Sequence, residues 1–135
     1  MNPNLRGYIF SRPFMGERVP QHVQNIIIKD FCDKNNYNYL LSVTEYTMKK
    51  SYLMLEKLMN DLNQVDGIVL YSLFQLPEEK EYRTKILNSI LRKKKLIMFA
   101  CEQLKVSSKD EMKKVELIWL VKKSLSNCTD IKFSI

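Results

Sequence analysis

The stretch GYIFSRPFMGERVPQHVQN, residues 7–25, joins a short apolar run to a dense group of polar and charged side chains. The apolar run is residues 8–10, and two prolines and a glycine interrupt the polar part, which holds the chain's single histidine, His22. This pattern is typical of a strand that runs into a loop and then into a helix. In an α/β protein, ligands bind where strands end in this way.

Outward from this stretch, apolar segments of strand length alternate with segments of helical periodicity. We expect strands at residues 5–10, 37–43, 68–73 and 96–100. We expect four helices. The first begins at Pro20, the second carries the apolar stripe of residues 55–62, the third begins at Pro77, and the fourth begins at the capping box Ser108–Glu111. This alternation predicts a three-layer α/β fold, with a mostly parallel sheet of four to five strands and helices on both faces.

Length and composition predict one domain, residues 1–135, with a core over about residues 5–126 and a short tail, 127–135. We expect residues 130–135 of the tail to add an edge strand. Hydrophobic residues make up 45%, which is enough for a core. No apolar run approaches the roughly 20 residues needed to span a bilayer. The first residues lack a signal-peptide core, so we expect a cytoplasmic protein without membrane insertion.

The three cysteines, Cys32, Cys101 and Cys128, are widely spaced and form no CxxC motif. With one histidine they do not make a usual zinc site, so we expect no metal and no cofactor. We therefore expect buried, unpaired thiols in a reducing compartment.

The chain carries a net charge of +7, from 22 Lys and Arg against 15 Asp and Glu. Such a surplus favours anionic partners, and it is also common in proteins that have none. The run RKKK, residues 92–95, falls where the third helix should end, so it complements the helix dipole or forms an anion-binding patch. Basic residues are interleaved with acids, and we do not expect a nucleic-acid partner.

The carboxyl ends of parallel strands meet at one edge of a sheet, so polar residues after the predicted strands should become neighbours. For catalysis the candidates are Ser11, His22 and Glu102. For binding an anionic ligand the candidates are Arg12, Arg18, Gln21, Gln24, Glu45, Ser72 and Gln75.

Each candidate has a chemical role and a plainer alternative. The two arginines suit a phosphate or carboxylate, a glutamate or His22 suits a general base, and Ser11 suits a nucleophile. Alternatively, Ser11 caps a turn and His22 lies on the surface or caps the first helical turn. In the same way, the acids Glu45 and Glu102 pair with the arginines and do nothing else.

Four segments resemble the catalytic domain of serine recombinases, the resolvases and invertases. They are VDGIVLYSLFQLPE (65–78), GYIFS (7–11), QNIIIKDFCDKNNY (24–37) and FACEQLKVSSKDE (99–111). The likeness covers roughly residues 7–126, and it implies a resolvase-like fold. The family's catalytic residues do not carry over. Its nucleophilic serine corresponds to Arg12, with Ser11 one place off, and its arginines correspond to Phe10, Tyr52, Gln75 and Glu78. Attack on DNA phosphate needs those arginines, so the resemblance implies a degenerate site and no active recombinase.

Residues 7–25 also resemble the signature of the sporadic carbohydrate cluster proteins, which are encoded beside bacterial genes for surface-polysaccharide biosynthesis. The likeness extends through VDGIVLYSLFQLP (65–77) and FACEQL (99–104), and it implies a role in carbohydrate assembly.

Three hypotheses follow, and none decides whether the chain is an enzyme. The first is a protein of glycan biosynthesis that binds a phosphorylated sugar or nucleotide sugar at the carboxyl edge of the sheet. The second is a non-catalytic homo-oligomer that scaffolds or regulates a glycan enzyme, because the last helix has a wide apolar face. The third is DNA binding of the resolvase kind.

Overall fold

The computed structural model describes the backbone of residues 2–133 and the side chains of residues 2–125. Its strands are β1 (Asn4–Phe10), β2 (Asn38–Glu45), β3 (Gly67–Leu70), β4 (Leu96–Phe99) and β5 (Leu104–Val106). Its α-helices are α1 (Gln21–Lys34), α2 (Leu53–Asn60), α3 (Lys80–Arg92) and α4 (Lys109–Phe133), with short 3₁₀ turns η1 (Leu62–Gln64) and η2 (Leu73–Gln75).

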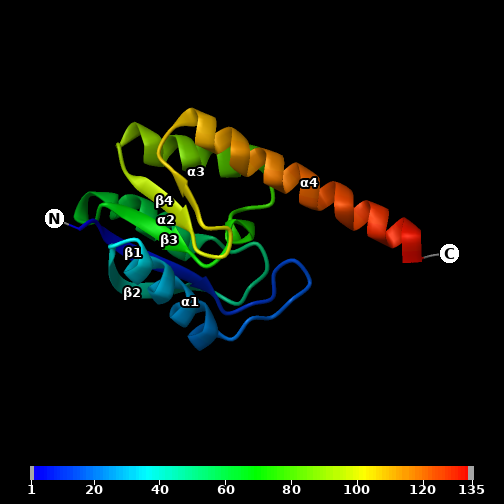
Figure 1. The fold of residues 1–135 in the computed structure, drawn as a ribbon, viewed down its shortest axis with the longest axis horizontal. Helices are drawn as coiled ribbons and strands as arrows, with labels where there is room; N and C mark the ends of the chain where they lie inside the picture. The colour runs from blue at the N-terminus through cyan, green and yellow to red at the C-terminus, as the bar shows by residue number, and fades with distance from the viewer. Residues whose placement is uncertain (1, 134–135) are drawn as a thin grey trace.

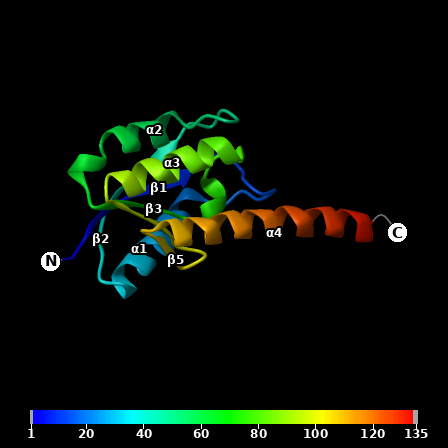
Figure 2. The same cartoon turned by 90° about the horizontal axis from the view of Figure 1, so that it is seen from above.

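The five strands of the described chain form one sheet in the order β2-β1-β3-β4-β5. The first four strands are parallel, and β5 pairs antiparallel with β4. Helices cover both faces: α1 lies on one face, and α2, α3 and the start of α4 lie on the other (Figures 1 and 2). The predicted three-layer α/β fold with a mostly parallel sheet is confirmed.

Alternate residues along the central strands are buried in two separate cores, one on each face of the sheet. On β3, Ile68 and Leu70 enter the core under α2, α3 and α4, whereas Val69 enters the core under α1. On β4, Ile97 and Met98 divide in the same way. A strand buried on both faces reads as a continuous apolar run, which is why the central strands could be recognised in the sequence.

Three predicted boundaries were wrong. The strand expected to reach residue 73 ends at Leu70, because the Ser72 hydroxyl and the Gln75 amide form a capping box that starts η2. The third helix begins at Lys80 rather than at Pro77. Residues 130–133 continue α4 instead of forming an edge strand, and β5 holds the edge next to β4. Residues 134 and 135 lie outside the described part of the chain.

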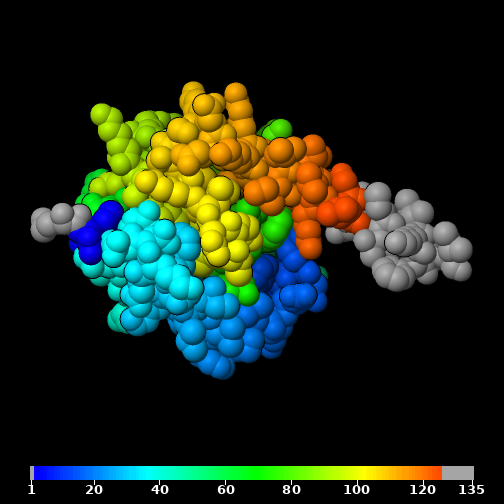
Figure 3. All heavy atoms as spheres, in the orientation of Figure 1, coloured from blue at the N-terminus to red at the C-terminus, as the bar shows by residue number. Residues whose placement is uncertain are grey.

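Helix α4 extends far beyond the body of the domain (Figure 1). Its 25 residues span about 37 Å. Figure 3 shows the middle of α4, drawn in orange, above the blue segment that follows β1. Among the described residues 2–133, no helix is both long and apolar enough to cross a membrane.

Candidate functional site

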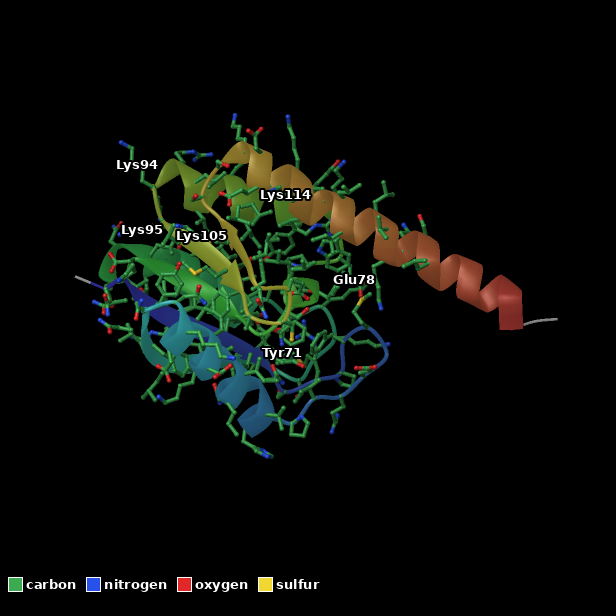
Figure 4. All side chains as sticks on the ribbon, viewed as in Figure 1. Tyr71, Glu78, Lys94, Lys95, Lys105 and Lys114 are labelled. Atoms are coloured by element: carbon green, nitrogen blue, oxygen red, sulfur yellow. The ribbon has the colours of Figure 1, made fainter. Side chains whose placement is uncertain are left out.

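The parallel strands bring the polar residues after them to one edge of the sheet, as the sequence predicts. Figure 4 shows Tyr71, just after β3, at this edge, and Lys94 and Lys95 at the opposite end of the sheet. The lysines follow the last turn of α3, where the RKKK run was expected.

Gln24 and Gln75 meet at the end of β1. The buried Gln24 donates from Nε2 to the Phe10 carbonyl at 2.8 Å and to the Val19 carbonyl at 2.9 Å. Its Oε1 accepts from the Phe10 N–H at 3.1 Å and from Gln75 Nε2 at 2.8 Å. The two amides therefore tie β1, α1 and η2 together, and these four bonds are internal to the protein.

Ser72 and Glu102 join the ends of β3 and β4. The Ser72 hydroxyl donates to Glu102 Oε2 at 2.8 Å, and the Leu73 N–H donates to Glu102 Oε1 at 2.9 Å. The Ser72 N–H donates to Gln75 Oε1 at 3.3 Å. Both oxygens of Glu102 thus hold the start of η2, which leaves this carboxylate poorly placed to act as a general base.

Glu45, at the end of β2, is 1% exposed and serves as a remote cap for α2. Its carboxylate accepts from the N–H groups of Met54 and Leu55, each at 3.2 Å, in the first turn of that helix. It also accepts from the Tyr8 hydroxyl at 2.8 Å. Burial and the nearby carboxylate raise the pKa of Tyr8 far above its usual range.

Arg12 is 8% exposed and holds the loop between β2 and α2. Its Nη1 donates to the carbonyl oxygens of Tyr46, Met48 and Ser51 at 2.9, 3.1 and 2.8 Å. The guanidinium carbon lies 4.2 Å from the centroid of the Phe10 ring.

Ser11 beside it donates to the Glu45 carbonyl at 2.9 Å, so its hydroxyl proton points to backbone and not to a base. The predicted pairing of the two glutamates with arginines is wrong. Within the described side chains the ion pairs are Lys29–Asp33, Lys34–Asp30 and Arg83–Glu116.

Arg18, Gln21 and His22 lie exposed on the loop before α1 and in its first turn. The helix begins after Pro20 with no side-chain cap and no acidic residue in the first turn. Two of the predicted binding residues, Arg18 and Gln21, and the predicted catalytic His22 therefore face solvent beside the open N-terminus of a helix, while the other predicted residues are engaged inside the domain.

Two thiols of the described side chains are unpaired, and the predicted burial is confirmed for Cys32, in the core under α1. It is wrong for Cys101, which is exposed because it lies in the turn just after β4. Burial raises the pKa of Cys32 to about 11, and partial burial also raises the pKa of Cys101. Neighbouring Tyr71 has a pKa of about 12, raised by burial and by Cys101. No group of three or more His, Cys, Asp or Glu within the described residues could hold a metal ion.

The sequence interpretation missed Arg83 on α3, a buried cation that anchors α4. Its Nη2 and Nε donate to the two oxygens of Glu116, both at 2.7 Å, and Nη1 donates to the Pro77 carbonyl at 2.9 Å. Its guanidinium carbon lies 4.4 Å from the centroid of the Trp119 ring. The signal was present, because Arg83 has the helical spacing of the buried residues Ile86, Leu87 and Ile90.

Comparisons with known proteins give a fold. No family model matches the chain, and no curated protein matches it. The N-terminal catalytic domain of TP901-1 integrase is similar in structure, with a TM-score of 0.62 and 14% identity over 93% of this chain and 96% of that one. A resolvase family site-specific recombinase from Streptococcus pneumoniae has a TM-score of 0.61 and 10% identity over 96% and 95%. The chain has the fold of a serine recombinase catalytic domain.

Proposed function

We propose that the chain is a non-catalytic interaction module that forms a homodimer through α4. The observation that carries this proposal is the solvent exposure of four large apolar side chains on that helix. They are Leu117, Leu120, Val121 and Leu125, which are 59%, 62%, 47% and 58% exposed.

Helix α4 is apolar on two opposite faces over its middle. Met112, Val115 and Trp119 recur at the spacing of one face and pack against the core of the domain. Leu117, Val121 and Leu125 recur at the spacing of another face and lie in solvent. A helix segment with apolar residues on every face is normally buried on every face, so the exposed apolar face of α4 indicates contact with a partner.

A second copy of this chain is the partner that the surface fits. Tyr46, Met48 and Leu53 are 51%, 64% and 57% exposed on and just after the loop between β2 and α2. That loop lies at the end of the domain from which α4 projects (Figures 1 and 2). Each copy thus carries an apolar helix and an apolar patch to receive one, as a two-fold contact requires.

The carboxyl edge of the sheet supports a non-catalytic role. Arg12 and Glu45 are buried and make their hydrogen bonds within the protein. Ser11, the hydroxyl nearest the place of the recombinase nucleophile, donates to a backbone oxygen. These contacts favour the absence of recombinase chemistry, which the substituted arginines also imply.

Sedimentation of the full chain over a range of concentrations tests the dimer. We expect the wild type to dimerise and Leu120→Lys to be monomeric, with the urea midpoint that the wild type has at concentrations too low for dimerisation. Leu41→Lys is the matched control, because Leu41 is 82% exposed on β2 and lies outside the proposed contact. A wild type that stays monomeric at every concentration, or a Leu120→Lys variant that dimerises like it, overturns the proposal.

A phosphorylated sugar or nucleotide sugar is the second candidate, on the strength of the carbohydrate-cluster resemblance and the exposed group at the start of α1. Arg18, Gln21 and His22 lie beside free N–H groups of that helix, which attract phosphate. The unpaired Cys32 and Cys101 suit a cytoplasmic location for such a role.

Thermal shift with glucose 1-phosphate and UDP-glucose tests this second candidate. We expect a shift that Arg18→Ala removes and that Arg92→Ala, at the far end of α3, retains. A shift that survives Arg18→Ala, or no shift with either compound, rejects the site.

A further inference from the structure

A hollow of about 220 Å³ opens between α2 and the face of the sheet that β2, β1 and β3 form. Val43, Leu58 and Ile68 contribute to its apolar lining, and Arg6, Lys57 and Asp61 contribute polar groups. Its lining on the helical side runs from Met54, in the first turn of α2, to Val65, just after η1. None of the site residues predicted at the carboxyl edge of the sheet lines it.

A β-bulge lies between two of the residues that line this hollow, Arg6 on β1 and Val43 on β2. Arg6 pairs with Leu40 and Tyr8 pairs with Val43, so β2 carries an extra residue opposite Gly7. A Cβ on Gly7 would overlap the Ser42 side chain, so only glycine lets the bulge close over β1. Bulges of this kind often lie next to functional sites.

The bulge also holds the cation at the hollow. Arg6 Nη1 donates to the Leu41 carbonyl at 3.1 Å, which fixes the guanidinium against β2. This bond uses one of the five N–H donors of the guanidinium. Arg6 and Lys57 form no ion pair with any acid among the described side chains, although Asp61 lines the same hollow. Two cations and one acid leave an excess of positive charge there.

We propose that this hollow binds a small monocarboxylate with a compact apolar body. The apolar lining takes the hydrocarbon part, and Arg6 with Lys57 takes the carboxylate. At about 30 Å³ for each water-sized group, the hollow holds roughly seven non-hydrogen atoms. A branched five-carbon acid such as isovalerate has this size and this chemistry.

Titration of the full chain with isovalerate, followed by the NMR signal of the Met54 methyl group, tests the site, because Met54 lines the hollow. We expect a saturable shift with isovalerate and binding roughly tenfold weaker for its neutral amide, isovaleramide. Lys57→Gln should weaken isovalerate binding roughly tenfold as well. Lys57 is exposed, so this variant should fold.

Two further variants separate the hollow from general charge. Val43→Phe, which fills the hollow without changing charge, should abolish the shift. Lys49→Gln, an exposed lysine that does not line the hollow, should leave it unchanged. Equal affinity for the acid and the amide, full binding in Lys57→Gln or Val43→Phe, or no saturable shift overturns the proposal. The dimer is tested separately by sedimentation of the full chain.

Discussion

Replacement of Glu45 by glutamine changes one atom in the most buried acid of the sheet edge. The carboxylate of Glu45 is 1% exposed and accepts hydrogen bonds from Tyr8, Met54 and Leu55. Glutamine fits the same space, but one oxygen becomes an NH₂ group that cannot accept a bond from an N–H group. The substitution therefore tests the capping role without making a cavity.

Two effects set the size of the change. A buried N–H group at the start of α2 loses its acceptor, which costs about 1–3 kcal/mol. The negative charge near the N-terminus of that helix is also lost, at a cost of about 1 kcal/mol in a buried setting. We expect Glu45→Gln to lower the free energy of unfolding by about 2–4 kcal/mol. Tyr8→Phe, which removes one donor to the same carboxylate, should cost about 1–2 kcal/mol.

Urea denaturation followed by circular dichroism measures both variants and the double variant. Because Tyr8 and Glu45 share a bond, the two costs should not add in the double variant. A Glu45→Gln variant within about 0.5 kcal/mol of the wild type would refute the capping role. In that case the carboxylate would be free for another purpose, such as the general base that the sequence suggested.

Three further predictions concern other contacts. Arg83→Met should lower the free energy of unfolding by about 2–4 kcal/mol in the same urea assay, because Glu116 and two backbone carbonyls lose a buried cation; a neutral result would contradict the anchor. Cys101 should react with iodoacetamide in the native protein, and the buried Cys32 should not. The alkylation rate of Cys101 should keep rising above pH 9, because its raised pKa limits the fraction of thiolate below that pH. Peptide mapping measures the labelling of both thiols, and equal labelling would refute the assigned difference in exposure. Gly7→Ala should cost about 1–3 kcal/mol through overpacking against β2; an unchanged urea midpoint would contradict the close approach.

The fold could be predicted because its signals are local. The central strands are continuous apolar runs, and the helices between them show apolar periodicity. Strand β5, residues 104–106, could not be predicted, because three residues carry little periodicity and its place depends on pairing with β4. The end of β3 was predicted wrongly for a different reason. Ser72 and Gln75 have capping-box spacing, but the apolar residues around them suggested a longer strand.

The gathering of polar residues at one edge of the sheet could be predicted, but their hydrogen-bond partners could not. The topology brings Gln24, Ser72 and Gln75 together, and this follows from strand order alone. Their hydrogen-bond partners are side chains and backbone groups from segments far apart in the sequence, and the sequence does not show which of them pair. Arg12 shows the difficulty, because a cation after a strand suggests an anion until the carbonyl oxygens around it are known.

Because α4 is anchored near its start and projects from the domain, a small rotation at the anchor would move its far end a long way. Glu116, held by Arg83, marks the fulcrum, and Phe133 lies about 26 Å farther along a straight helix. A tilt of about 10° at the fulcrum would sweep the far end through about 4–5 Å. Small rearrangements among Arg83, Glu116 and Trp119 would thus move the far end of α4 by more than the length of a hydrogen bond.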